Sequence, residues 1–373
     1  MRIRRISFYD AFDCEKGACE ESCCRAWSIP VDDEALARFR KERGLLRLRL
    51  FLAVRGREEK ILNPARGRCI FFRRDGLCDL QCKKGASYVP YTCRVYPRRH
   101  VRRLDVAEET LDLSCIAAAR LFLASSMPLV MTETKGSVSY GRRGTNRDKT
   151  FLEGLVSSLD RLTRLLQEEE TGVDEALRRA LALAVSFQNR AVHGKDPFAG
   201  EDGDRIFEQT LFPLDIALLN EWVNGCLYTE DIRRRLPFLY RLFRMYFRHF
   251  DGLNVTQGKR RLSGLYASFE ASGLADASKY KKYAAYMLMR TYTETQEDYS
   301  FVRRLTDCVM HVNLIYLFDA LYAEEKGTLS LSEQAHIIAV YEKRVLHNAG
   351  VQKDMHAKWE GRLFPADGVT YGG

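Results

Sequence analysis

The chain has 373 residues, of which 46% are hydrophobic and 29% are charged. This composition supplies enough apolar material for a packed core, and the length suggests about two domains. No run approaches the ~18 consecutive apolar residues of a membrane span, and the basic first residues lack the apolar segment of a secretory signal. A disordered chain is therefore excluded, and we expect a cytoplasmic protein that is neither secreted nor embedded in a membrane.

Charge and cysteine are both concentrated in the first third of the chain. Residues 1–125 contain 26 Lys and Arg against 17 Asp and Glu, a balance of +9, whereas the remainder has 33 of each. Nine of the 11 cysteines also precede residue 125. We therefore predict a cysteine-rich module over residues 1–125 and a different kind of domain after it.

The elements predicted for this first module mix helix and strand. Asp32–Leu50 is predicted to be helical, because its first three residues are acidic and complement a helix N-terminus. Asn63-Pro64 is a breaker, and Asp75-Gly76 predicts a turn. Arg99–Leu113 fits a β-hairpin, and Cys115–Ala124 fits a short helix. The module is therefore expected to be α+β.

The remainder of the chain is predicted to be helical. Residues 126–149 are interpreted as a linker or loop, and from Thr150 the 3.6-residue period dominates. A leucine stripe from Leu152 to Leu165 and another run beginning at Ala176 open this part, and later helical runs are predicted at 214–225, 229–250, 258–271, 278–295, 299–326 and 331–347. The fold class is therefore mainly α, a cysteine-rich α+β module followed by an all-α bundle over residues 150–373.

The early cysteines carry the chemical signal. They are spaced Cys14-x4-Cys19-x3-Cys23-Cys24, Cys69-x8-Cys78-x3-Cys82-x10-Cys93 and then x21-Cys115. Gathered thiolates repel one another unless a cation neutralises them, and soft sulfur selects zinc or iron–sulfur clusters. The spacing favours a cluster or a binuclear site over a simple zinc finger.

Two other uses of cysteine are weighed against a metal centre. Disulfides would need an export signal that the sequence lacks. Buried structural thiols fit Cys226 and Cys308, each alone on an apolar helical stripe, but not nine thiols among charged residues. The side chains of the adjacent Cys23 and Cys24 tend to point in different directions, which is awkward for one mononuclear site. The two residues would then serve two sites, or one of them would lie outside the ligand set.

Five segments, in order, resemble the flagellin lysine N-methylase family. They are Phe8–Cys14, Cys19–Trp27, Gly76–Cys78, Cys93–Arg98 and Leu113–Cys115, and the resemblance continues through Tyr283 to His347. The amino-terminal part is also similar to a broader group of zinc- or iron-chelating proteins with a C-x3-C-C signature. The chain departs from the family at Cys69-Ile70 and Cys115-Ile116, where Cys-Pro is usual, and Cys82 is an addition.

The resemblance implies N-methylation of lysine side chains on flagellin or another protein substrate. It also implies S-adenosylmethionine as methyl donor and an iron–sulfur cluster, with 4Fe-4S preferred and zinc as the alternative. The implied ligands are drawn from Cys14, Cys19, Cys23, Cys24, Cys69, Cys78, Cys93 and Cys115. Eight thiols exceed the needs of one four-iron cluster, so one site or two remain open.

Residues beside the cysteines supply further candidates. Arg94 and Arg98 flank Cys93 and are candidates for binding a carboxylate of donor or substrate, or for neutralising a cluster. Tyr91 and Tyr96 are expected to pack, with a substrate-lysine pocket as the alternative, and Trp27 is expected to shield the metal. His100 is a conceivable ligand, and Tyr283, Tyr286 and Tyr292 are expected in the core. No residue is identified as catalytic.

The sequence leaves the cofactor chemistry and two rival functions open. No Gly-rich turn supports a Rossmann-type site, and the third position of the radical motif C-x3-C-x2-C falls on Ala26. A basic zinc module binding nucleic acid is a rival class, although no reading helix supports it. A metal-holding protein without catalysis is the other rival.

Overall fold

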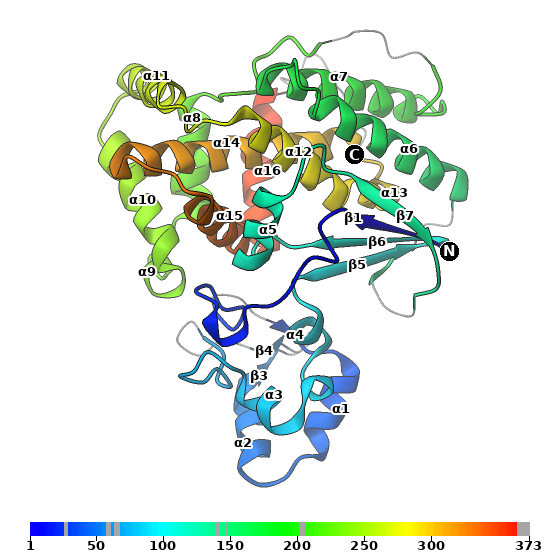
Figure 1. Cartoon of the computed structure of the whole chain (residues 1–373). Coiled ribbons are helices and arrows are strands. Elements are labelled where there is room, and N and C mark those ends of the chain that lie inside the picture. Colours follow the sequence, from blue (N-terminus) through cyan, green and yellow to red (C-terminus); the bar gives the residue numbers. More distant parts are fainter. Residues whose placement is uncertain are drawn as a thin grey trace.

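The structure is a computed structural model that describes residues 1–25, 29–56, 61–62, 68–138, 142–145, 148–200 and 206–363. Its fold is mainly α, as predicted. A helical bundle packs beside a mixed β-sheet, and a smaller lobe hangs from the sheet (Figure 1). No helix among the described residues is long and apolar enough to cross a bilayer.

The main sheet has five strands in the order β7-β1-β6-β5-β8. β1 pairs parallel with β6 and antiparallel with β7, while β5 pairs antiparallel with β6 and parallel with β8. The strands are β1 (Arg2–Ile6), β5 (Arg98–Arg103), β6 (Val106–Leu111), β7 (Met131–Lys135) and β8 (Arg142–Arg143). The predicted hairpin is therefore confirmed as β5 and β6.

The prediction of a linker or loop over residues 126–149 is wrong in part. β7 lies in this segment and pairs with β1 from Met131 to Lys135, and β8 extends the opposite edge of the sheet. The physical reason is that β1 has a second edge of unpaired backbone groups, which β7 satisfies. The Thr132 hydroxyl adds a hydrogen bond to the Arg5 carbonyl at 3.1 Å.

The lobe is built from short elements between β1 and β5. It contains β2 (Ile29–Pro30), β3 (Val54–Arg55), β4 (Ile61–Leu62), α1 (Asp33–Lys41), α2 (Gly44–Ala53), α3 (Asp79–Lys84), α4 (Tyr91–Val95) and the single 3-10 turns η1 (Lys16–Ala18) and η2 (Ala86–Tyr88). The predicted helix over Asp32–Leu50 is split into α1 and α2, because the chain leaves helical geometry at Glu42 and Gly44 has a φ of +62°. Asp32 caps α1 through a 2.8 Å hydrogen bond from the Ala35 amide.

The bundle contains most of the predicted helices. They are α5 (Ile116–Ala124), α6 (Lys149–Leu166), α7 (Val173–Val192), α8 (Ile216–Trp222), the π-turn η3 (Val223–Leu227), α9 (Ile232–Arg235), α10 (Pro237–Phe250), α11 (Val255–Ala271), α12 (Ala277–Thr291), η4 (Tyr292–Glu294), α13 (Thr295–Asp298), α14 (Phe301–Lys326), α15 (Leu331–Val345) and α16 (Ala349–Leu363). α14 is buried around its whole circumference, as expected of a central helix. α16 was not predicted.

Of the four hydrophobic clusters among the described residues, the two largest form the cores of the bundle and of the lobe. The larger core joins one face of the main sheet to the bundle, running from Ile6 to Trp359. The smaller core has ten buried residues between Ile29 and Val89 and belongs to the lobe alone. Cys115 belongs to the larger core, whereas Cys69, Cys78 and Cys93 pack against the smaller one. The candidate ligands therefore lie along the boundary between the two cores.

Candidate metal centre at the lobe–bundle junction

Short turns and helix ends position the thiols. Cys78 and Cys115 are the residues that precede α3 and α5, and Cys93 lies within α4. Burial raises the pKa of the Cys78 and Cys115 thiols, and the backbone amides of the turn that follows each residue act against it. Donors at a helix N-terminus favour the thiolate form, so both sulfurs are placed where a metal-bound thiolate is stabilised.

Two cysteine-bearing loops are held together by a glycine contact. Gly76 has a φ of +78°, and a Cβ at this position would lie 2.6 Å from the Gly17 carbonyl oxygen. A Cβ at Gly17 would in turn lie 2.6 Å from the Asp75 carbonyl oxygen. Only glycines permit this approach, which brings the loop from Cys14 to Cys19 against the loop from Cys69 to Cys78.

Seven thiols interact with one another around Cys23. The thiols of Cys23 and Cys24 are hydrogen-bonded to each other, and this bond, followed by burial, raises the pKa of Cys23 well above its usual value. Cys23 also raises the pKa of five other thiols, those of Cys19, Cys69, Cys78, Cys93 and Cys115. The early sulfurs are thus gathered in one region.

Burial and mutual repulsion raise the pKa of the Cys19, Cys23, Cys69, Cys78, Cys93 and Cys115 thiols. Burial is the largest cause for Cys69, whose pKa is raised to about 11, and for Cys115, whose pKa is raised to about 12. For Cys93, burial comes first and the thiols of Cys23, Cys69 and Cys78 add to it. A cation would reverse both effects, because it favours the thiolate.

The remaining early cysteines lie at the margin. Cys14 is exposed, and its sulfur accepts a 3.4 Å hydrogen bond from the Lys16 amide. Cys82 is also exposed. It contributes to the raised pKa of Cys78. None of the eleven cysteines, all of which are described, forms a disulfide. Cys226 and Cys308 are buried in the bundle, as predicted for structural thiols.

These thiols have the chemistry of metal ligands, but their side chains are not arranged around a common point. Gathered sulfurs are the donors that zinc and iron–sulfur clusters prefer. Within the described parts of the chain, however, no three Cys, His, Asp or Glu side chains are already arranged as a metal-binding group. Binding would therefore require the sulfurs to move toward a common centre.

Neighbouring candidates are engaged with protein partners. Arg94 lies over the Tyr91 ring at 5.5 Å, and Arg98 lies over the Phe12 ring at 5.1 Å and donates to the Phe12 carbonyl. The two nitrogens of His100 contact the hydroxyls of Tyr9 and Tyr91, at 2.6 and 3.2 Å. His100 is thus not offered as a ligand in this arrangement. Trp27 lies outside the described residues.

A buried lysine of the bundle joins the thiol region to α15. Lys343, whose side chain is 0% exposed, donates to the Glu21 backbone carbonyl at 2.8 Å and pairs with the Glu21 carboxylate at 3.1 Å. His336 contacts the same carboxylate at 3.0 Å. Burial opposes ionisation of Glu21, but these two partners lower its pKa to about 2. The positive charge of Lys343 also favours the thiolates of Cys19 and Cys23.

A second set of buried polar contacts lies beside Cys115. The Ser114 hydroxyl contacts His347 Nε2 at 2.7 Å and the Tyr96 hydroxyl at 3.0 Å, and α5 packs on α15. Two further contacts join this junction, the 2.9 Å pair of Arg290 with Asp112 and the 3.0 Å hydrogen bond from Tyr283 to Glu342.

The sequence did not identify the bundle side of this junction. Tyr283, Tyr286 and Tyr292 are buried in the core, as expected. Lys343, His347 and Glu342 were missed, although two adjacent charged residues on a buried helix were a usable signal.

Comparison with known proteins finds lysine-N-methylases that are similar to this chain over nearly its full length. The chain is 21% identical to a lysine-N-methylase of Salmonella choleraesuis (strain SC-B67), over 95% of this chain and 94% of that protein. The resemblance spans nearly the whole chain. A lysine-N-methylase of Salmonella typhimurium is likewise 21% identical over the same share of both chains.

A third relative covers only part of the chain. The flagellar biosynthetic protein FliU of Salmonella muenchen is 24% identical over 40% of this chain and 95% of its own length. No protein-family model matches the chain, and no solved structure matches it. The expected similarity to the flagellin lysine methylases is therefore supported by lysine-N-methylases of matching length.

Proposed function

We propose that this protein is a lysine-N-methylase that acts on protein lysine side chains, with flagellin as the substrate. The observation that carries the proposal is the similarity to lysine-N-methylases over nearly the full length of both chains. The flagellar relative supports the choice of substrate. In the overall reaction a methyl group replaces one hydrogen of the lysine amine, and a proton is released.

We further propose S-adenosylmethionine as the methyl donor and an iron–sulfur cluster as a resident group. Cys19, Cys23, Cys24, Cys69, Cys78, Cys93 and Cys115 are the residues that would hold the cluster, with Cys14 as a peripheral eighth candidate. When bound, such a cluster supplies electron transfer or an open metal coordination position.

The protein must also supply a neutral amine. At pH 7 only roughly one lysine amine in a few thousand is neutral, given a pKa near 10.4. A water-poor junction lowers that pKa, because burial disfavours the ammonium form. The buried contacts around Ser114 and Asp112 provide such surroundings beside Cys115. Arg94 and Arg98 remain the proposed carboxylate-binding residues, and they would have to leave their aromatic partners to act.

The decisive experiment measures metal and methyl transfer on the same samples. The protein is purified without oxygen, its iron, sulfide and zinc are quantified, and it is incubated with flagellin and methyl-labelled S-adenosylmethionine. Iron and sulfide together with label on flagellin lysine support the proposal. Bound metal with no label on any lysine would instead favour a non-catalytic zinc- or iron-chelating protein.

Cysteine variants test the ligand set. We expect Cys23→Ser and Cys93→Ser to weaken metal binding at least tenfold, since even loss of a residue that only supports a ligand costs about 10–100-fold. Cys82→Ser is the matched control, because its thiol is exposed, and it should retain full metal content. Full metal in both Cys23→Ser and Cys93→Ser would remove these residues from the set.

A further inference from the structure

Two candidate ligands lie on the two chains that leave the open end of the β5–β6 hairpin. The last pair of this ladder joins Arg98 to Leu111. Cys93 comes shortly before Arg98 in the sequence, and Cys115 comes shortly after Leu111. Because β5 and β6 are antiparallel, both cysteines leave the sheet at the same end.

Backbone pairing between these two chains ends just before the cysteine turns. The Asp112 amide donates to the Pro97 carbonyl at 2.8 Å, one step beyond the ladder. After this bond each amide turns back to its own chain, since Tyr96 donates to the Thr92 carbonyl at 3.0 Å and Cys115 donates to the Asp112 carbonyl at 3.2 Å. A contact that holds the two cysteine turns together therefore has to come from side chains.

The Ser114 hydroxyl supplies such a contact. Its oxygen lies 3.0 Å from the hydroxyl of Tyr96, which directly follows α4, and 2.7 Å from Nε2 of His347, which lies just after α15. Ser114 is 0% exposed, so both contacts are shielded from solvent. A hydroxyl can donate one hydrogen bond and accept another, so Ser114 satisfies both partners at once.

This contact lies where the chain passes from one core to the other. Tyr96 packs against the larger core, whereas Cys93, on the helix before it, packs against the core of the lobe. Cys115 belongs to the larger core. The bond between Ser114 and Tyr96 thus links the cysteine of the lobe to the cysteine of the bundle.

The chain before Ser114 is itself bonded to the bundle. The buried Tyr286 hydroxyl of α12 donates to the Leu111 carbonyl at 3.1 Å and accepts a hydrogen bond from the Leu113 amide at 3.2 Å. Ser114 therefore holds the turn of Cys93 from a segment that is already fixed to α12.

We propose that Ser114 is a positioning residue of the metal centre. Its hydroxyl holds the turn that carries Cys93 against the turn that carries Cys115, so that these two sulfurs enter the site as a fixed pair. The proposal rests on the proposed function, because it requires a metal that is bound by both cysteines.

The test measures metal retention, which does not depend on methylation. Wild type and Ser114→Ala are loaded with iron and sulfide without oxygen, and separately with zinc, and the bound metal is measured against increasing concentrations of a chelator. We expect Ser114→Ala to bind metal about 10–100-fold more weakly, as when a residue that orients a ligand is removed. Ser114→Thr keeps the hydroxyl and should retain more metal than Ser114→Ala.

Ser158 provides a matched control. It is also buried, and its hydroxyl contacts the Tyr292 hydroxyl at 3.1 Å within the bundle. Ser158→Ala loses the same kind of contact, so the Tm of the two alanine variants should fall by similar amounts, but only Ser114→Ala should lose metal. Equal metal loss in both variants, or full retention in Ser114→Ala, would overturn the proposal.

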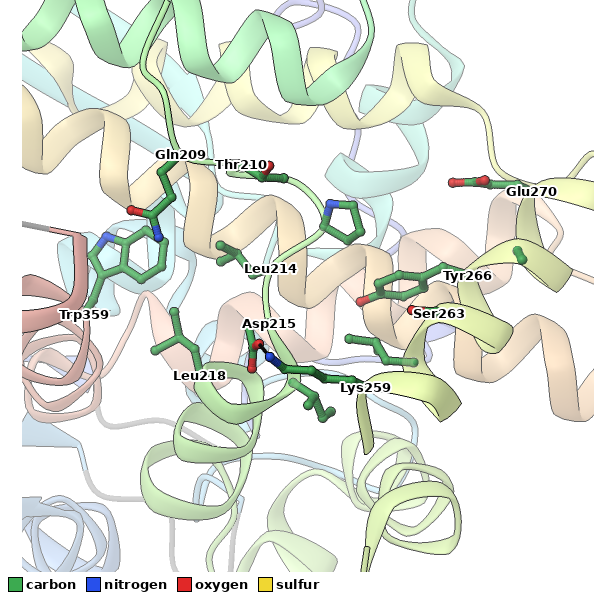
Figure 2. A pocket seen from close by; sticks show the side chains of 14 residues that line it. Gln209, Thr210, Leu214, Asp215, Leu218, Lys259, Ser263, Tyr266, Glu270 and Trp359 are labelled. Atoms are coloured by element: carbon green, nitrogen blue, oxygen red, sulfur yellow. Dashed lines mark ion pairs between the residues drawn. The ribbon is translucent and has the colours of Figure 1, made fainter. Parts of the chain in front are cut away.

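An exposed serine far from the thiols provides a second control. Ser263 of α11 lines a pocket beside α8, at the end of the bundle away from the lobe (Figure 1, Figure 2). Its side chain is exposed, so Ser263→Ala should change neither the Tm nor metal retention. Metal loss equal to that of Ser114→Ala would also overturn the proposal.

Tyr96→Phe tests the same contact from its other side. Because Ser114 and Tyr96 share one hydrogen bond, the double variant should lose little more metal than the more affected single variant. Additive losses would show that the two residues act independently, and would overturn a shared role in holding the two turns.

Methylation of flagellin separates this proposal from the proposed function. If the wild type binds metal but methylates no lysine, the proposed function fails, and metal retention still decides the role of Ser114. If the wild type methylates flagellin while Ser114→Ala retains all its metal, only the positioning role fails. A wild type that binds no metal would overturn both the positioning role and the proposed cluster.

Discussion

At the scale of single residues, Gly76 has a role that no side chain can take over. Its backbone conformation is left-handed, and its Cα faces the Gly17 backbone. We expect Gly76→Ala to lower both the Tm and the metal content, because the new Cβ would push apart two cysteine loops. Calorimetry and metal analysis measure the two effects.

Gly85 offers a matched control for this substitution. Its φ is +85°, close to that of Gly76, but a Cβ there meets nothing within 4 Å. Gly85→Ala thus carries the same backbone strain without the collision. Equal metal content in the two variants would show that the Gly17 contact does not hold the thiol loops.

Asp319 predicts a dependence of stability on pH. Burial raises its pKa from 3.8 to about 7, against hydrogen bonds from Gln334 and Tyr280. The folded state then binds more protons than the unfolded state between about pH 4 and 7, so stability falls as pH rises through this window. The loss is on the order of 4 kcal/mol once Asp319 is ionised.

Asp319→Asn should remove this part of the pH dependence. We expect the free energy of unfolding of the variant to fall less between pH 5 and pH 8, as measured by urea denaturation at each pH. Glu342, whose pKa burial raises to about 8, acts in the same direction and leaves a residual slope. If the free energy of unfolding fell equally with pH in the variant and the wild type, the raised pKa of Asp319 would be wrong.

At the scale of elements, α15 contacts Glu21 through Lys343 and His336, and the buried member of this group is Lys343. Lys343→Met should reduce the free energy of unfolding by about 3 kcal/mol, because it leaves the buried Glu21 carboxylate with His336 alone. Lys326→Met, at the exposed end of α14, is the control and should change stability by less than about 0.5 kcal/mol. If denaturant titration gave the same loss of stability for both variants, the pairing of Lys343 with Glu21 would not stabilise the fold.

Local sequence patterns predicted those helices and strands whose hydrophobic residues or flanking signals follow one regular spacing. The acidic start of α1, the leucine stripe of α6 and the existence of a hairpin formed by β5 and β6 were predicted. β1 was not predicted, because it carries three arginines yet lies inside the sheet. Arg4 is buried there in an ion pair with Asp160, a partner 156 residues away that no local pattern reveals.

The same limit applies to the candidate site. Cysteine density and spacing predicted a metal centre, and this stays a prediction, because no group of three Cys, His, Asp or Glu side chains among the described residues is arranged to hold a metal. The glycine contact between their loops and the pairing of Lys343 with Glu21 depend on folding over more than 50 and 300 residues, respectively. The position of Arg94 and Arg98 against aromatic rings also follows from packing rather than from sequence spacing.

At the scale of the whole molecule, the two cores differ in size and therefore in local stability. The lobe has ten buried apolar residues and a sheet of two-residue strands, whereas the other core runs through the bundle. We expect amides of α1 and α2 to exchange with deuterium faster than those of α14, because small cores open more readily. Mass spectrometry of exchanged fragments measures this difference.

Bound metal should reduce the difference in deuterium exchange rate between the lobe and the bundle. Cys69, Cys78 and Cys93 pack on the small core, so metal held by their sulfurs would stabilise the lobe against opening. Exchange in α1 and α2 should then slow on loading with iron and sulfide, while α14 stays unchanged. If α1 and α2 exchanged at the same rate with and without metal, the metal would not stabilise the lobe.

The position of Lys343 late in the chain has a consequence for biosynthesis. A ribosome completes all eight candidate ligands, Cys14 to Cys115, more than 200 residues before it reaches this lysine. Until then, Glu21 has no buried cation and the lobe has no α15 to rest on. The contact of Lys343 with Glu21 is thus among the last that translation makes possible, and during that interval the thiols would remain accessible to the proposed metal.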